Sequence, residues 1–262
     1  MGESIAFDRA AEFYDQTRAI SDESMARTIE LLASELRERG RVLEVGVGTG
    51  LLALPLHEAG IDLAGVDLSP AMLRKLVEKA AGTVPFPLVV GDATKLPLED
   101  GAFGAAYLRW VLHLVPDWRT VLAEAVRVVR PGGVFLVNLG AYGGPRKEIQ
   151  ERFAEITAVP VKPIGLHWGD YGELESAMTA LGARVRELPS LHEGGTDTLG
   201  EFIEGIEENR YSWTWPLPED QRRRAAAEVR SWAEERFGSL DERRPFEHAT
   251  RWLAYDLGPR SG

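Results

Sequence analysis

The stretch that decides the fold reads Val42-Leu43-Glu44-Val45-Gly46-Val47-Gly48-Thr49-Gly50. Three apolar residues and one carboxylate lead into three glycines at alternate positions, and an apolar helix start at 51–54 follows. In α/β proteins, a buried strand that turns through glycines into a helix brings backbone close to a nucleotide-like ligand. We therefore expect residues 46–50 to cradle such a ligand.

The spacing of these glycines separates two kinds of nucleotide site. Dinucleotide-binding proteins use G-x-G-x-x-G, and that pattern would put the third glycine at position 51, where the chain has Leu51. Here the third glycine is Gly50, one residue earlier, which gives G-x-G-x-G. The spacing counts against a nicotinamide-dependent oxidoreductase, which stays open as the less favoured alternative.

Composition excludes several classes of function. The chain has 262 residues, a formal charge of −11 and no cysteine. The acidic balance argues against binding a phosphate backbone, so we expect no nucleic-acid partner. Without cysteine there are no disulfides or thiolate metal sites, which is compatible with a reducing cytoplasm. We expect neither a signal peptide nor a membrane-spanning helix, and therefore a cytoplasmic protein.

Strand-like and helix-like segments alternate along the middle of the chain. Apolar runs predict strands at 41–45, 61–66, 87–90, 103–108 and 134–138, and amphipathic patterns predict helices at 51–59, 69–79 and 118–129. A Pro-Gly-Gly turn at 130–133 precedes the fifth strand. This alternation is typical of a parallel, doubly wound α/β sheet.

The flanking regions are less regular. Residues 5–38 read as helical, with capping side chains at 21–24. After residue 140, the patterns predict helices at 144–158, 171–181, 198–209 and 219–237, and strands at 183–188 and 246–257. The helical pieces at 144–158 and 197–237 read as insertions that cover one end of the sheet.

Polar residues stand where the predicted strands end. Asp67 ends the second strand and is suited to accept from ribose hydroxyls, and Asp92 follows the third strand. Arg109, Trp110 and His113 follow the fourth. Ligands of open α/β sheets bind outside the carboxyl ends of the strands, so we expect these side chains to share one site.

Five segments in order resemble the class I S-adenosylmethionine-dependent methyltransferases, and most closely the type 11 group that acts on small molecules and quinone precursors. They are a glycine motif at 44–50, a ribose motif at 65–73, an adenine motif at 91–97, a segment at 112–118 and a turn at 128–133. Residues 7–18 are similar to the family's N-terminal lead-in. The resemblance implies a seven-stranded, mostly parallel Rossmann-like sheet with helical insertions forming a lid.

The resemblance also implies residue roles. The three glycines would contact the methionine and ribose part of S-adenosylmethionine, Asp67 the ribose, and Asp92 the adenine. Tyr14 and Arg18 would close over its amino-acid end, where a guanidinium suits a carboxylate. Glu44 would either hold the glycine loop or contact the cofactor's ammonium. The predicted cofactor residues are Tyr14, Arg18, Glu44, Gly46, Gly48, Gly50, Asp67, Leu68, Asp92, Ala93 and Arg109.

Residues for catalysis and for the acceptor are harder to identify. His113 is a candidate general base because imidazole titrates near neutrality, although a packing role fits it as well. A candidate apolar substrate pocket comprises Tyr142, Trp168, Tyr211, Trp213 and Trp215, whose aromatic rings suit a protein core equally. No metal ligands are expected.

We therefore predict a single methyltransferase domain over 1–262, with a helical lead-in at 1–38, a cofactor-binding core at 39–140 and the remaining sheet plus lid at 141–262. A sulfonium methyl is already activated, so aligning a small-molecule acceptor in line with it would supply most of the acceleration. The alternative from another class is a non-catalytic S-adenosylmethionine-binding regulatory protein. A homodimer is compatible with the sequence.

Overall fold

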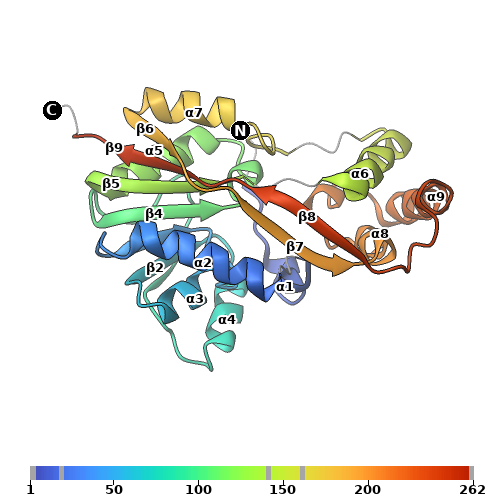
Figure 1. The fold of residues 1–262 in the computed structure, drawn as a ribbon, viewed down its shortest axis with the longest axis horizontal. Helices are drawn as coiled ribbons and strands as arrows, with labels where there is room; N and C mark the ends of the chain where they lie inside the picture. The colour runs from blue at the N-terminus through green and yellow to red at the C-terminus, as the bar shows by residue number, and fades with distance from the viewer. Residues whose placement is uncertain (1–3, 18–20, 140–142, 160–162, 260–262) are drawn as a thin grey trace.

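The computed structural model describes residues 4–17, 21–139, 143–159 and 163–259, and a seven-stranded sheet runs through its centre (Figure 1). Its strands are β1 (Val42–Val45), β2 (Leu63–Asp67), β3 (Leu88–Val90), β4 (Phe103–Arg109), β5 (Val129–Asn138), β6 (Ala183–Glu187) and β9 (Leu253–Leu257). The spatial order is β3-β2-β1-β4-β5-β9-β6. Neighbours from β3 to β5 are parallel, and β9 runs antiparallel to β5 and β6. The predicted doubly wound, mostly parallel seven-stranded sheet is confirmed.

Helices cover both faces of this sheet (Figure 1). The helices α2 (Asp22–Leu36), α3 (Ala53–Glu58) and α4 (Pro70–Lys79) lie on one face, and α5 (Trp118–Val128) and α7 (Tyr171–Ala180) on the other. Successive side chains of a strand point to opposite faces, so Tyr107 packs with the α2 and α3 residues and Leu108 with those of α5 and α7. All seven residues of β4 are buried as a result.

Local capping signals predicted the helix starts well. Ser69 accepts a hydrogen bond from the Met72 N–H at 3.2 Å, with Pro70 in the first turn of α4. Ser21 caps α2 through the Ser24 N–H in the same way. Each side chain satisfies a backbone donor that the first helical turn leaves unpaired.

A separate helical unit lies beyond the carboxyl ends of β4 and β5 (Figure 1). It consists of α6 (Gly144–Thr157), α8 (Leu199–Glu207) and α9 (Glu219–Phe237), which share a core that includes Phe153, Ile203 and Val229. A two-stranded ribbon of β7 (Leu191–Asp197) and β8 (Arg244–Thr250) runs between this unit and the main sheet. The predicted insertions at 144–158 and 197–237 thus lie together at one end of the sheet.

Two sequence predictions were wrong at the chain ends. The single strand expected at 246–257 is two strands, β8 and β9, separated at Arg251 and buried Trp252. β8 pairs with β7, which the sequence did not reveal, because its Gly194-Gly195 pair carries no strand signal and only the distant partner orders it.

The helix expected over residues 5–38 is also interrupted. The segment forms a 3₁₀ turn η1 (Asp8–Ala10), a short helix α1 (Tyr14–Thr17) and then α2. Asp8 explains part of this break, because its Oδ1 accepts hydrogen bonds from the Ser69 hydroxyl at 2.8 Å and the Ala71 N–H at 3.1 Å. Contacts with α4 therefore outweigh local helix preference here.

The predicted turn at 130–133 is a bulge inside β5. The register passes from Phe103 opposite Val129 to Ala105 opposite Val134, so four residues bulge beside Gly104. An added Cβ on Gly104 would stand 1.5 Å from the Arg39 carbonyl oxygen and cannot be accommodated without moving backbone. A close approach of two backbones therefore requires glycine at this position.

We predict that Gly104→Ala lowers the free energy of unfolding by at least about 2 kcal/mol, because the clash is with backbone rather than with a flexible side chain. Urea denaturation followed by circular dichroism measures this. Gly172→Ala in α7, where a Cβ meets nothing closer than 3.8 Å, is the control and should leave stability unchanged or raise it. Equal stability of the two variants would contradict the prediction.

Candidate functional site

The glycine loop after β1 is shaped by left-handed backbone. Gly46, Gly48 and Gly50 have φ angles of +76°, +54° and +75°, which L-residues with a side chain rarely adopt. The N–H groups of Gly46 and Val47 both donate to the Val66 carbonyl of β2, at 2.8 and 3.0 Å. The turn therefore lies flat against the end of the neighbouring strand.

These three glycines do not occupy equivalent places. Gly46 and Gly48 line a cleft at the carboxyl ends of β1, β2 and β4. A Cβ on Gly50 would instead stand 2.8 Å from Leu76, in the packing between the loop and α4. Gly50 thus allows the helix to approach, and the two earlier glycines present backbone to the cleft.

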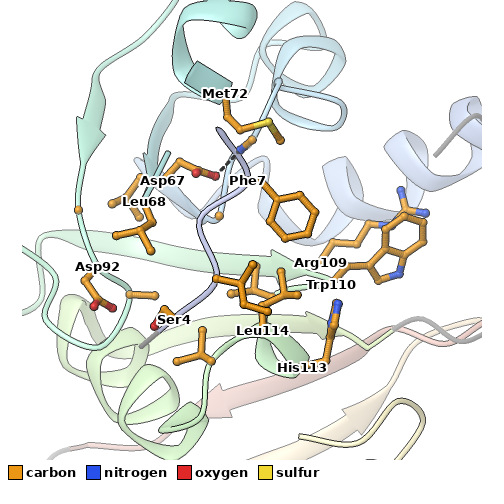
Figure 2. A pocket seen from close by; sticks show the side chains of 18 of the residues that line it. Ser4, Phe7, Asp67, Leu68, Met72, Asp92, Arg109, Trp110, His113 and Leu114 are labelled. Carbon is orange, nitrogen blue, oxygen red and sulfur yellow. Dashed lines mark hydrogen bonds between the residues drawn. The ribbon is translucent and has the colours of Figure 1, made fainter. Parts of the chain in front are cut away.

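Asp67 links the glycine loop to the next helix. Its carboxylate accepts the Gly48 N–H and the Ser69 N–H, both at 2.8 Å, and it lines the cleft (Figure 2). Burial raises the pKa of Asp67, and the two backbone hydrogen bonds oppose that rise. The loop, the end of β2 and the start of α4 are therefore held by one side chain.

Asp92 and its neighbours form one end of the cleft. Asp92 Oδ1 accepts from the Thr94 N–H at 2.8 Å and the Thr94 hydroxyl at 2.9 Å, which is ordinary turn chemistry. Ala93 and Leu68 lie beside it in the cleft wall. The residues of the predicted ribose and adenine motifs are thus neighbours in space.

Glu44 lies beneath the cleft rather than in its wall. Its side chain is buried, and Glu44 Oε2 accepts the Tyr107 hydroxyl hydrogen at 2.8 Å. Burial raises the pKa of Glu44 to about 8, against the opposing effects of the Tyr107 hydrogen bond and the Arg109 charge. This hydrogen bond joins Glu44 to β4, and the two roles expected for Glu44 stay predictions.

The N-terminal segment forms another wall of the cleft (Figure 2). Ser4, Ile5, Phe7 and Tyr14 line it, and the Ile5 N–H donates to the Leu114 carbonyl at 3.2 Å. Ion pairs join this segment to α4, between Glu12 and Lys75 at 2.9 Å and between Asp15 and Lys79 at 2.7 Å. Arg18, the predicted partner of Tyr14, lies outside the described residues.

The loop after β4 forms the end of the cleft opposite Asp92 (Figure 2). Arg109, Trp110 and His113 line this end, and His113 belongs to the 3₁₀ turn η2 (Leu112–Leu114). The Trp168 ring lies 5.7 Å from the His113 ring, centroid to centroid. The whole cleft encloses about 740 Å³, part of it open to solvent.

The predicted aromatic pocket is dispersed. Tyr211 and Trp213 stack at 5.6 Å within the core of the helical unit, near Phe153 and Phe202. Trp215 and Trp168 approach the cleft, where the Trp215 ring lies 4.9 Å from that of Phe7 and the Trp168 ring 5.7 Å from that of His113. Tyr142 lies outside the described residues. Periodicity alone does not distinguish core aromatics from ligand-lining ones.

Several lining residues were missed from the sequence. They are Ser4, Ile5, Phe7, Val66, Met72, Gly91, Val111, Leu114 and Val115. Most are apolar, and the likeness at 7–18 and the motifs at 65–73, 91–97 and 112–118 were the signals that could have identified six of them. In the described parts of the chain, no cluster of three or more potential metal-binding side chains occurs and no helix has the length and apolar character to cross a membrane.

Comparison with known proteins agrees with this geometry. Residues 43–137 match the family described as "Methyltransferase domain". A malonyl-[acyl-carrier protein] O-methyltransferase of Serratia marcescens is 33% identical over 205 residues, which cover 77% of this chain and 76% of that protein. A demethylmenaquinone methyltransferase of Beutenbergia cavernae is 30% identical over 192 residues, which cover 71% and 70%.

Other relatives align over a shorter length. A malonyl-[acyl-carrier protein] O-methyltransferase of Geobacter sulfurreducens is 34% identical, but the alignment covers only 59% of each protein. This chain therefore spans little more than half of that relative's length.

Solved structures share the fold at low identity. The YcgJ protein of Bacillus subtilis aligns with a TM-score of 0.60 and 18% identity, over 92% of this chain and 100% of that one. The [4+2]-cyclase SpnF aligns with a TM-score of 0.57 and 17% identity, over 99% of both chains. Since one neighbour is named for a different reaction, this likeness concerns the fold alone.

The buried Glu44 makes stability depend on pH. Its folded-state pKa of about 8 exceeds the ordinary 4.5, so the folded protein keeps a proton that the unfolded chain loses. The stabilisation from this bound proton is complete below the pKa that Glu44 has in the unfolded chain. It is lost as the pH rises through the pKa that Glu44 has in the folded protein.

We predict that the free energy of unfolding of the wild type, relative to Glu44→Gln, falls by more than about 1 kcal/mol between about pH 5.5 and about pH 7.5. Glutamine cannot ionise but still offers an oxygen to Tyr107. Urea titrations at both pH values measure the difference. Exposed Glu38→Gln is the control and should keep the wild-type slope; the same slope in Glu44→Gln would disprove the assignment.

Proposed function

This chain belongs to the S-adenosylmethionine-dependent methyltransferases, and we propose that it transfers a methyl group from that cofactor to a small-molecule acceptor. One observation carries the proposal. The backbone of Gly46 and Gly48 borders a cleft at the carboxyl ends of parallel strands, beside the Asp67 carboxylate that accepts the Gly48 N–H.

The residues present fit this cofactor. A Cβ on Gly46 would stand 2.4 Å from the Val111 side chain, so glycine at this position lets the loop approach Val111 in the cleft wall. Asp67 is a carboxylate suited to the ribose hydroxyls, and Asp92 with Ala93 and Leu68 would hold the adenine end. Tyr14 in the N-terminal wall, with Arg18, would meet the amino-acid end.

The mechanism requires positioning more than acid–base chemistry. When bound, S-adenosylmethionine supplies a methyl group on a positively charged sulfur. The protein's contribution is then to orient the acceptor in line and to exclude water. Ile5, Phe7 and Leu114 supply an apolar wall for this purpose. The helical unit with Trp215 would act as the predicted lid over that wall.

The relatives' names support acceptors whose methylated part is a small organic group, since they include demethylmenaquinone and malonyl-[acyl-carrier protein]. The charge of −11 also supports a non-nucleic-acid acceptor. A cytoplasmic location, a single domain over 1–262 and a homodimer stay predictions.

We predict that the protein binds S-adenosylmethionine and S-adenosylhomocysteine but neither NAD nor NADP. We also predict that Asp67→Ala lowers the affinity for S-adenosylmethionine and for S-adenosylhomocysteine at least about 30-fold. The loss corresponds to one or two charge-assisted hydrogen bonds of about 1.5–3 kcal/mol each. Isothermal titration calorimetry measures it. Asp62→Ala, at the opposite end of β2 in an exposed pair with Arg41, is the matched control and should bind normally.

Nicotinamide binding without S-adenosylmethionine binding would overturn the proposal. Release of S-adenosylhomocysteine with an added acceptor separates an enzyme from a protein that only binds the cofactor. Unchanged affinity in Asp67→Ala would remove Asp67 from the site.

We propose His113 as the general base for acceptors that must lose a proton. Its ring lies in the cleft wall beside Trp168. We expect His113→Gln to lower kcat with hydroxyl or amine acceptors by about 10²-fold or more, while S-adenosylhomocysteine affinity stays unchanged. Radiolabelled methyl transfer measures this, with His57→Gln in α3 as the control. An unchanged kcat would leave His113 a packing residue.

A further inference from the structure

The end of the cleft opposite Asp92 holds a stacked pair of Arg109 and Trp110 (Figure 2). Arg109 is the last residue of β4 and is only 7% exposed. Its guanidinium carbon lies 4.1 Å from the centroid of the Trp110 ring. Stacking occupies a face of the guanidinium, whereas its N–H groups lie in the plane and remain directed along its edges.

The backbone of Trp110 is unusual in a way that supports this pair. Trp110 has a φ of +59°, a left-handed conformation that costs a bulky residue about 1–3 kcal/mol. The Trp110 N–H donates to the Asn138 carbonyl of β5 at 3.1 Å, which helps to hold the turn. The strained turn brings the indole under the guanidinium and so orients Arg109 before any ligand arrives.

The charge at this end differs from the rest of the cleft. Among the described residues that line it, Arg109 is the one side chain with a permanent positive charge, and Asp67 and Asp92 are acidic. A cofactor with a sulfonium cation would add positive charge nearby. An anionic acceptor would offset both charges, and a planar guanidinium binds a carboxylate through two parallel hydrogen bonds.

Resting on the proposed function, we propose that Arg109, stacked on Trp110, binds a carboxylate of the methyl acceptor. The acceptor class is then a small carboxylic acid rather than a neutral molecule. Trp110 is a positioning residue in this scheme. The cofactor's methionine portion is the other source of a carboxylate in the cleft. The resemblance assigns Tyr14 and Arg18 to it, and the proposal departs from the prediction that Arg109 is a cofactor residue.

The test uses carboxylate probes on the complex with S-adenosylhomocysteine. Benzoate and malonate are titrated against benzamide and malonamide, and the Trp110 indole N–H resonance is followed by NMR, with Trp110→Phe to identify it. We expect the carboxylates to shift this resonance and bind at least about 10-fold more tightly than the amides. We expect Arg109→Gln to abolish that preference and Arg109→Lys, which keeps the charge without the fork, to retain part of it.

The matched control is Arg119→Gln. Arg119 also stacks on a tryptophan, with 4.2 Å from its guanidinium carbon to the Trp118 ring centroid, but it is exposed and pairs with Glu173 away from the cleft. This variant should bind the probes like the wild type. Thermal unfolding of each variant verifies that it is folded.

A second arm distinguishes the two sources of carboxylate. 5′-Methylthioadenosine lacks the amino-acid portion of S-adenosylhomocysteine. If Arg109 serves the acceptor, Arg109→Gln changes the affinity for either nucleoside by less than about 2-fold, or under 0.5 kcal/mol. A 10-fold loss for S-adenosylhomocysteine alone would overturn the proposal in favour of the cofactor's carboxylate.

Equal binding of carboxylates and amides to the wild type would also overturn it, as would unchanged carboxylate preference in Arg109→Gln. These outcomes leave the proposed function intact. A wild type that does not bind S-adenosylhomocysteine at all would instead overturn the proposed function, and this inference with it.

Discussion

The hydrogen bonds accepted by Asp67 are the interaction on which the site depends. One carboxylate receives the N–H groups of Gly48 and Ser69, at 2.8 Å each, and so joins the loop after β1 to the end of β2 and the start of α4. This is possible because β1 and β2 are parallel and in register, with Val45 opposite Val66. The glycine loop and the aspartate therefore emerge at the same edge of the sheet.

Charge is distributed along the cleft in a definite order. Asp92 lies at one end, Asp67 in the middle and Arg109 at the opposite end, whereas Glu44 is buried and does not line the cleft. Burial keeps Glu44 protonated to unusually high pH, so Glu44 is part of a hydrogen-bonded pair with Tyr107 rather than an exposed charge.

Contacts between distant parts of the chain build the N-terminal wall of the cleft. Phe7 lies between the rings of Tyr14 and Trp215, and the Arg9 guanidinium carbon lies 4.7 Å from the Trp215 ring centroid. The N-terminal segment thus bridges the main sheet and the helical unit. Since solved proteins of the same fold include one named as a cyclase, the fold by itself does not decide the reaction.

The sequence by itself determined the parallel strands, the glycine turn and most helix starts, because these follow from local signals. Alternating apolar runs, the G-x-G-x-G spacing and the caps at Ser21 and Ser69 act within a few residues. Strand order then brings Asp67, Asp92, Arg109 and His113 to one edge. The roles of these residues stay predictions.

Only the tertiary structure decided the features that depend on contacts between distant residues. β7 and β8 pair across about fifty residues of intervening sequence, Asp8 interrupts the expected N-terminal helix through α4, and the aromatic residues divide between core and cleft. The stacking of Arg109 on a left-handed Trp110 likewise needs β5 beside β4. Long-range pairing and packing outweigh local preference at each of these places, so no pattern in neighbouring residues indicates them.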